Sequence, residues 1–279
     1  MKSLSGRVAV VTGAASGVGR GLVDRFAAEG MKVVLADVEE GPLAAAVDEV
    51  RAGGAEAIGV RTDVRHEAEV QHLAERTLEA FGAVHVLCNN AGVETGARFA
   101  DIPTASWQWV LDVNVWGVIH GCRTFLPLMR QQGEGHIVNT GSGASFSASL
   151  PTFAPYITSK FAVLGLSESL DMELRAGGED IHVSLLAPIA RTRMTESERN
   201  RPRGVAATDA DPDRVKVLDA IRAGNEVMAI EIPEIAGMVV DAILAERFYV
   251  VVGAEHTVTA LEERIAWIRG GPAAEQLAL

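Results

Sequence analysis

Short runs of apolar residues alternate along the chain with longer segments in which apolar residues recur every three or four positions. The short runs predict strands at 7–11, 32–36, 57–61, 84–88, 136–139, 181–186 and 248–252. The longer segments predict helices at 17–29, 43–51, 67–81, 106–130, 156–175, 213–224, 234–245 and 259–269. The strands are continuously apolar rather than alternating, which is typical of a parallel sheet buried on both faces. We therefore expect an α/β fold with a doubly wound, Rossmann-like parallel sheet, in a single domain over residues 1–279.

The regular pattern fails between Met194 and about Pro212, where polar residues, proline and glycine dominate. This stretch follows the predicted strand 181–186 and precedes mixed helical sequence. Irregular segments at such strand ends commonly cover substrates in this type of sheet. We predict a variable substrate lid over about 193–225.

The chain is acidic, with 25 Lys and Arg against 37 Asp and Glu in 279 residues and a formal net charge of −12. Such an excess repels polyanions and makes nucleic acid an unfavourable partner. No apolar run reaches the roughly 20 residues that span a bilayer, and the first residues contain no signal-peptide core. These features predict a cytoplasmic protein that acts on a small molecule, with no nucleic-acid or membrane partner.

Two cysteines, Cys88 and Cys122, are too few for a disulfide framework or a cysteine metal site. Their apolar surroundings predict buried free thiols. The histidines at 66, 72, 85, 120, 136 and 182 form no metal-ligand spacing, and His136 begins a predicted strand, which favours a structural role. We expect no metal site.

A glycine-rich stretch, Thr12-Gly13-Ala14-Ala15-Ser16-Gly17-Val18-Gly19, closes the first predicted strand and opens the first helix. In this context Gly13 permits a tight turn, Gly17 lets the backbone approach a pyrophosphate, and Gly19 lets the helix lie close to the sheet. Backbone N–H groups at the helix start would hold the anion, with Ser16 and Val18 among the contacting residues. The stretch predicts a dinucleotide-binding site.

Asp37 ends the second predicted strand, 18 positions after Gly19. That separation suits a carboxylate that binds the adenosine ribose hydroxyls, although a surface acid at a strand end is the plainer alternative. A 2′-phosphate would lie against this carboxylate, and two like charges about 4 Å apart cost about 1 kcal/mol even in water. Arg20 follows the glycine loop, but no cation adjoins Asp37 in the sequence, so NAD is favoured over NADP.

Further motifs make the chain resemble the short-chain dehydrogenase/reductase family from Gly6 to about Thr192. Beside the glycine loop, the matching residues are Asp63-Val64, Asn89-Asn90-Ala91-Gly92, Asn114, Ser142 and Tyr156-Ile157-Thr158-Ser159-Lys160, in the family's order. For the cofactor, the resemblance implies adenine contacts from Asp63 and Val64 and further contacts from Asn90, Ala91, Gly92, Tyr156, Lys160 and Thr192.

The same resemblance implies a catalytic set for a secondary alcohol or ketone, consisting of Asn114, Ser142, Tyr156 and Lys160. Tyr156 and Lys160 are four positions apart and share one face of a helix. An ammonium about 4 Å from the phenol, at an effective dielectric near 20, would supply about 4 kcal/mol and lower the phenol pKa by roughly three units. Tyr156 would then act as the base, and Lys160 would also hold the nicotinamide ribose. Ser142 would bind the substrate oxygen, while Asn114 would kink its helix and hold a water for proton relay.

Two stretches depart from the family pattern. Ser142 precedes Tyr156 by 14 positions instead of 13, and Gly143 occupies the strict position. The nearby hydroxyls are alternatives, but the order of residues after the strand selects Ser142 over Ser145, Ser147 and Ser149. After the strand 181–186, Pro188 is not followed by the usual glycine, and Thr192 comes four instead of five positions later. This second departure changes the roof of the pocket.

The candidate substrate walls are mostly apolar and comprise Val93, Glu94, Thr95, Phe146, Phe153, Ile189 and Met194. They predict a medium-sized hydrophobic or aromatic alcohol or ketone. The arginines at 193, 199, 201 and 203 would attract a substrate carboxylate, or they are the charges of a solvated lid.

The leading hypothesis is therefore an NAD-dependent oxidoreductase for a secondary alcohol or ketone. One alternative is an NADPH-preferring carbonyl reductase. Another is a catalytically silent dinucleotide-binding protein, which would be expected to lack Tyr156 or Lys160.

The helices 106–130 and 156–175 carry more apolar residues than one buried stripe needs. Because the family resemblance implies that these two helices pair across a dyad, we expect a homodimer or homotetramer.

Overall fold

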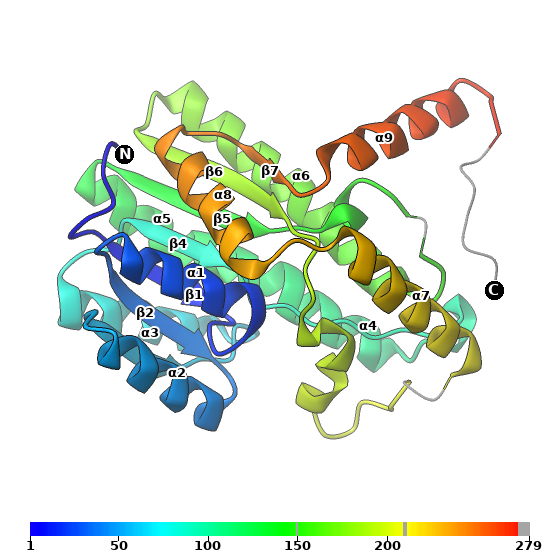
Figure 1. The fold of residues 1–279 in the computed structure, drawn as a ribbon, viewed down its shortest axis with the longest axis horizontal. Helices are drawn as coiled ribbons and strands as arrows, with labels where there is room; N and C mark the ends of the chain where they lie inside the picture. Colours follow the sequence, from blue (N-terminus) through cyan, green and yellow to red (C-terminus); the bar gives the residue numbers. More distant parts are fainter. Residues whose placement is uncertain (149, 209–210, 273–279) are drawn as a thin grey trace.

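The computed structural model describes residues 1–148, 150–208 and 211–272. Within these residues, seven parallel strands form one sheet in the order β3-β2-β1-β4-β5-β6-β7 (Figure 1). They are β1 (Val8–Thr12), β2 (Lys32–Asp37), β3 (Ala57–Arg61), β4 (Val86–Asn89), β5 (Gly135–Thr140), β6 (Ile181–Ala187) and β7 (Tyr249–Val251). The direction of winding reverses between β1 and β4, which opens a crevice at the carboxyl ends of the strands. The predicted doubly wound, Rossmann-like sheet is confirmed.

Helices cover both faces of this sheet. The described ones are α1 (Gly17–Ala28), α2 (Glu40–Ala52), α3 (Glu67–Phe81), α4 (Thr104–Leu111), α5 (Gly117–Gln132), α6 (Ala154–Gly177), α7 (Pro212–Met228), α8 (Ile232–Leu244) and α9 (Ala254–Ile268). Shorter turns are η1 (Phe99–Asp101), η2 (Asp112–Trp116), η3 (Gly143–Ser145) and η4 (Arg193–Asn200). Helices α1, α2 and α8 pack with Val11 on one face, and α3, α5 and α6 pack with Val10 on the other. Successive residues of β1 thus enter opposite cores, which explains its continuous apolar sequence.

The predicted helix 106–130 is divided by η2, a π-helical turn over Asp112–Trp116. Asn114 lies inside this turn, so the kink expected there takes the form of a π turn. The amide of Asn114 bridges to the chain after β4, since its Oδ1 accepts from Val93 N and its Nδ2 donates to Val93 O, both at 2.9 Å.

The C-terminal half differs from the sequence expectation at three element ends. The stretch expected to be irregular from Met194 contains η4, α7 continues to Met228, and α9 begins at Ala254 instead of 259. Gly253, in the left-handed conformation with φ 65°, starts α9. Helix α9 has no buried residue among those described and extends away from the sheet (Figure 1). Its first turns therefore lack the apolar periodicity from which a helix start is predicted.

Two further expectations concern burial. Cys88 and Cys122 are buried free thiols, as predicted. His136 is buried on β5, where its Nε2 lies 2.8 Å from Ser184 Oγ, in agreement with a structural role. Across the described residues, no helix combines the length and the hydropathy needed to cross a bilayer.

Candidate active site

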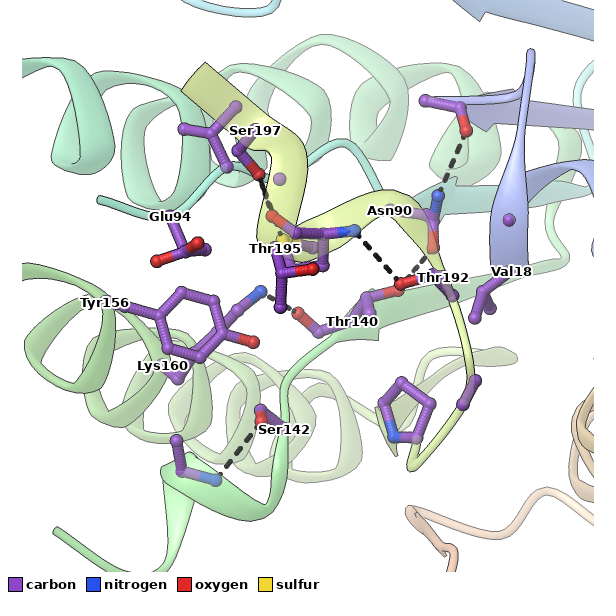
Figure 2. A pocket seen from close by; sticks show the side chains of 18 of the residues that line it. Val18, Asn90, Glu94, Thr140, Ser142, Tyr156, Lys160, Thr192, Thr195 and Ser197 are labelled. Carbon is purple, nitrogen blue, oxygen red and sulfur yellow. Dashed lines mark hydrogen bonds between the residues drawn. The ribbon is translucent and has the colours of Figure 1, made fainter. Parts of the chain in front are cut away.

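A cavity of about 690 Å³ lies at the carboxyl ends of the strands (Figure 2). Its walls come from the loops after β1 to β6 and from η4, α7 and the first turns of α9. The residues predicted from sequence that line it are Gly13, Ser16, Gly17, Val18, Asp37, Asp63, Val64, Asn90, Ala91, Gly92, Ser142, Tyr156, Lys160 and Thr192. The predicted cofactor and catalytic residues are thus brought together, except that Gly19 and Asn114 support the lining from outside it.

Two positions of the glycine loop, Gly13 and Gly19, leave no room for a side chain. Gly13 has φ 64°, and a Cβ there would lie 2.9 Å from Ala91 Cα. A Cβ on Gly19 would lie 2.2 Å from the carbonyl oxygen of Gly13, so α1 approaches the loop as closely as glycine allows. The first turn of α1, Gly17-Val18-Gly19-Arg20, has no acidic residue, and its first two residues line the cavity. This cradle fits the pyrophosphate of a dinucleotide.

Asp37 closes the loop from the end of β2. Its Oδ2 accepts a hydrogen bond from Ala15 N and its Oδ1 from Glu39 N, each at 3.0 Å. These contacts fix the carboxylate at the cavity wall, in the place expected for a ribose-binding group.

The expected adenine end of the cavity contains an ion pair that the sequence analysis did not identify. Arg65 donates to both carboxylate oxygens of Asp63, with Nη2 to Oδ2 at 2.6 Å. Burial alone would raise the pKa of Asp63, but the hydrogen bonds from Arg65 outweigh it and the pKa lies below its usual range. The Asp63 carboxylate is therefore ionised and held in place beside Val64.

Thr12 and Asn90 join the first and fourth strands directly behind the cavity. Thr12 Oγ1 accepts from the backbone N–H groups of Asn90 at 2.9 Å and Ala91 at 3.1 Å, and Asn90 Nδ2 donates to Thr12 O at 3.0 Å. Through these hydrogen bonds the Asn-Asn-Ala-Gly motif braces the central strands. Asn114 Nδ2 also donates to Ser159 Oγ at 2.9 Å, so both of its hydrogens are used within the protein.

Tyr156, Lys160 and Ser142 meet on the opposite wall of the cavity (Figure 2). Tyr156 and Lys160 come from one face of α6, and the Lys160 Nζ lies 5.5 Å from the centre of the Tyr156 ring. Lys160 Nζ also donates to the carbonyl oxygen of Thr140 at 2.8 Å. Ser142 follows β5, and its hydrogen bond with the phenol lowers the pKa of Tyr156.

The pKa of Tyr156 differs from the sequence expectation in its direction. Burial raises the pKa of Tyr156 to about 12, the hydrogen bond with Ser142 opposes this, and the charge of Glu94 adds to it. Burial also lowers the pKa of Lys160 to about 8. The protein's own groups therefore favour a neutral phenol and weaken the cation beside it, because both side chains are removed from water. The expected lowering by roughly three units neglected this desolvation.

The alternative hydroxyl Ser145 is committed elsewhere. Ser145 Oγ donates to Lys160 O at 2.9 Å and to no cavity group among the described residues, whereas Ser142 lines the cavity. Together they form a reciprocal cap of η3, in which Ser142 Oγ accepts from Ala144 N at 3.2 Å and Ser145 Oγ contacts Ser142 N at 3.2 Å. The choice of Ser142 over Ser145 agrees with this geometry. Ser149 lies outside the described residues.

The unusual segment after β6 still brings Thr192 to the dinucleotide loop. A Cβ on Gly17 would lie 3.4 Å from Thr192 Cγ2, and Thr192 Oγ1 accepts from Met194 N at 3.3 Å to begin η4. Thr192 thus lines the cavity despite the shorter spacing from Pro188.

Most predicted substrate walls line the cavity, namely Val93, Glu94, Phe146, Phe153, Ile189 and Met194. The prediction for Thr95 is wrong. Its side chain points into a buried polar cluster, where Oγ1 donates to Glu198 Oε1 at 2.7 Å and lies 2.7 Å from Thr208 Oγ1. Thr95 therefore fastens the loop after β4 to the segment 193–208 instead of facing a substrate.

Two arginines of this segment, Arg193 and Arg199, are paired with carboxylates. Arg193 Nε lies 3.0 Å from Glu196 Oε2, and Arg199 Nε lies 2.9 Å from Glu39 Oε1. Both line the cavity, but each has a carboxylate partner.

Arg214 is a cavity neighbour that the sequence did not reveal. Its side chain is fully buried on α7, and its Nη2 lies 2.7 Å from Glu94 Oε2. A charged residue on a predicted helix is expected to be exposed, and no local signal points to a partner 120 positions away.

A second arrangement that only the fold creates is the trio Asp180, His182 and Glu246, in which His182 Nε2 lies 3.1 Å from Asp180 Oδ1.

Comparison with known proteins agrees with this geometry. A family model described as short chain dehydrogenase matches residues 7–203. The crystal structure of a short chain dehydrogenase/reductase from Burkholderia phymatum in complex with NAD is 39% identical, covers 100% of both chains and superimposes with a TM-score of 0.93. The CLA biosynthesis dehydrogenase/reductase of Lactiplantibacillus plantarum is 30% identical over 95% of this chain and 94% of its own. The 1-deoxy-11-beta-hydroxypentalenate dehydrogenase of Streptomyces exfoliatus is 32% identical over 88% and 82%, respectively. The chain belongs to the short-chain dehydrogenase/reductase family and is an alcohol/ketone oxidoreductase.

Proposed function

We propose that the protein transfers a hydride between NAD and a medium-sized secondary alcohol or ketone with a hydrophobic or aromatic body. The observation that carries the proposal is that Tyr156, Lys160 and Ser142 share one cavity with the glycine loop and Asp37. When bound, the nicotinamide supplies or accepts the hydride. Around it, Ser142 holds the substrate oxygen, Tyr156 takes or gives the hydroxyl proton, and Lys160 fixes the nicotinamide ribose. A relay water at Asn114 would bind its main-chain carbonyl, because both Nδ2 hydrogens are used within the protein.

The proposal of NAD over NADP rests on charge at the ribose end of the cavity. Asp37 faces the cavity there, while the nearby cations are engaged, Arg65 by Asp63 and Arg199 by Glu39. A 2′-phosphate would meet a carboxylate without an available cation to offset it. The similar Burkholderia phymatum protein forms a crystalline complex with NAD, which supports the same choice.

The substrate class follows from the other half of the cavity. Phe146, Phe153, Ile189, Met194 and Leu150 give it apolar walls, which favour an apolar or aromatic substrate body. Similar proteins named as a levodione reductase and as a 1-deoxy-11-beta-hydroxypentalenate dehydrogenase support an alcohol or ketone substrate. We also propose that segment 193–225 acts as the lid over this half.

The decisive experiment is a panel of secondary alcohols and ketones with NAD(H) and NADP(H), followed by nicotinamide absorbance. We expect turnover of apolar members with NAD and near-complete loss in Tyr156→Phe, while this variant still binds NAD. Full activity of Tyr156→Phe would overturn the proposed mechanism. Turnover with NADP alone would favour the NADPH-preferring alternative.

We propose a homodimer or homotetramer, formed through the face of α4, α5 and α6. Large apolar side chains are exposed on and beside these helices, Trp116 at 48% and Met172 at 70%. Light scattering of the purified protein tests this, and a monomer at micromolar concentration would contradict it.

The buried free thiols Cys88 and Cys122 suit a reducing compartment, which supports the cytoplasm as the location.

A further inference from the structure

We propose that Arg214 is a positioning residue for Tyr156: from α7 it holds both Glu94 and Phe153 in place around the phenol, so that seating of the segment 193–225 prepares the base. The proposal rests on the proposed function, because it assigns Tyr156 the role of base. It concerns residues for which neither the motif pattern nor the resemblance predicts a catalytic role.

Arg214 makes two contacts that converge on the tyrosine. Its Nη2 lies 2.7 Å from Glu94 Oε2, and its guanidinium carbon lies 5.0 Å from the centre of the Phe153 ring. Phe153 in turn packs edge-on against Tyr156, with ring centres 6.3 Å apart and planes at 87°. A planar guanidinium can pair with a carboxylate and stack on a ring at the same time, which the ammonium of lysine does less well.

Further contacts beside this one fasten the described part of the segment 193–225 to the loop after β4. Thr208 Oγ1 donates to Glu198 Oε1 at 2.6 Å, and Thr95 joins the same carboxylate from the loop after β4. Arg98 pairs with Asp213, the neighbour of Arg214 in the chain. These contacts hold the described part of the segment against the loop after β4. Arg214 is the residue of the segment that extends toward Tyr156.

Among the described residues, the charged groups that face Tyr156 come from three elements. Glu94 lies on the loop after β4, Lys160 on α6 and Arg214 on α7, while Arg193 and His256 line the same cavity from η4 and α9. Figure 2 shows Glu94 and Lys160 close to the Tyr156 ring, with the Lys160 amine directed toward Thr140. A carboxylate beside a phenol favours its protonated form, and a guanidinium in contact with that carboxylate cancels much of its field.

Stability alone does not account for this arrangement. A buried ion pair replaced by apolar groups of similar volume is often neutral or stabilising, because desolvating two charges costs as much as their attraction returns. Both partners are buried, with the Arg214 side chain at 0% and that of Glu94 at 2% exposure. What the pair does beyond stability is the effect of the Glu94 charge on the pKa of the proposed base, which Arg214 moderates in this proposal.

The chain permits a direct test because it contains only two tyrosines, Tyr156 and Tyr249. In a Tyr249→Phe background, the pH titration of tyrosinate absorbance reports Tyr156 alone. Since the pKa of Tyr156 is already about 12, we expect Glu94→Gln to lower its midpoint by about one pH unit and Arg214→Met to show no titration step below about pH 12 over the range in which circular dichroism shows the variant folded. Arg214→Lys keeps the charge, so its midpoint should stay near the parent value.

The double variant Glu94→Gln with Arg214→Met removes both charges, and it should titrate between the two single variants even if Arg214→Met alone folds poorly. In the pH profile of kcat/KM the same shifts should appear, with Arg214→Lys retaining the limb position but losing several-fold in kcat. Equal midpoints in all variants would reduce Arg214 to a structural role and overturn the proposal. Because the titration needs no turnover, absence of activity in the parent protein would overturn the proposed function and leave this test readable.

Discussion

The Lys160 ammonium donates a hydrogen bond of 2.8 Å to the carbonyl oxygen of Thr140, the last residue of β5. This bond ties α6 to the centre of the sheet and fixes the amine beside Tyr156. It also places the amine in a fully buried position, where desolvation lowers the pKa of Lys160 to about 8. The burial that accompanies this contact therefore weakens the charge of the amine.

Removing this amine should change how stability depends on pH. The pKa of Lys160 is about 8 in the folded protein and 10.5 when unperturbed, so between these values the unfolded chain binds more protons and stability rises with pH. In Lys160→Met that rise should disappear. Urea unfolding at about pH 8 and about pH 10 should show the wild type gaining about 2 kcal/mol relative to the variant. The exposed Lys2→Met is the control, and a parallel pH dependence of Lys160→Met and wild type would contradict the prediction.

Gly19→Ala should destabilise the protein and weaken NAD binding. The new Cβ would lie 2.2 Å from Gly13 O and 2.5 Å from Asn90 Nδ2, so α1 must move away from the glycine loop. Overpacking of this kind costs about 1–3 kcal/mol. Gly41→Ala is a matched control, since the structure places nothing within 4 Å of its Cβ. Thermal unfolding and NAD titration check both variants, and equal behaviour of the two would contradict the close approach.

These two predictions show which parts of the site the sequence reveals. The glycine loop and the pair Tyr156 and Lys160 follow from spacings of a few residues, and Asp37 follows from its place at the end of the next strand, 18 positions after Gly19, so local pattern is sufficient. The strands follow for the same reason, because each is a short apolar run buried on both faces.

Thr95 and Arg214 show where such reasoning ends. The place of Thr95 after the Asn-Asn-Ala-Gly turn predicts a substrate wall, but its side chain bonds to Glu198, 103 positions away. In the sequence, Arg214 on an amphipathic helix is indistinguishable from an exposed residue. Contacts between residues so far apart in the chain depend on how α7 and η4 pack against the sheet. No local pattern of apolar and polar residues predicts them. The direction of the Tyr156 pKa shift is mispredicted for a related reason, since desolvation is a property of the assembled cavity.

Replacing Asp37 should alter the choice of cofactor. Asp37→Ser removes the carboxylate at the ribose end and its bonds to Ala15 N and Glu39 N. A hydrogen bond to a charged group contributes about 1.5–3 kcal/mol, so we expect the Kd for NAD to rise about 10- to 100-fold while that for NADP rises less or falls. Asp24→Asn, an exposed acid on α1, controls for net charge. Equal losses for both cofactors would contradict the assignment of Asp37 to the ribose.

Both thiols should be unreactive in the folded protein. Burial raises the pKa of Cys88 far above its usual range and that of Cys122 to about 12, so neither forms the nucleophilic thiolate near neutral pH. A chromogenic disulfide reagent should label less than one thiol before denaturation and both in urea. Rapid labelling of the native protein, with Cys88→Ala used to assign the site, would contradict their burial.

Thr95→Val should loosen the contact between the loop after β4 and the segment 193–208 without disturbing the catalytic wall. Valine keeps the shape of threonine but leaves Glu198 Oε1 and Thr208 Oγ1 without the Thr95 hydroxyl that lies 2.7 Å from each. Glu198 Oε1 keeps its hydrogen bonds from Thr208, so the variant loses one hydrogen bond to a charged group, which contributes about 1.5–3 kcal/mol, and the segment 193–208 should detach more often. We expect faster proteolysis within 193–225 and a several-fold higher KM at nearly constant kcat. Thr259→Val, whose hydroxyl bonds only to Glu255 O within α9 among the described residues, should change neither. Unchanged proteolysis and KM in Thr95→Val would show that the segment is held by its other contacts.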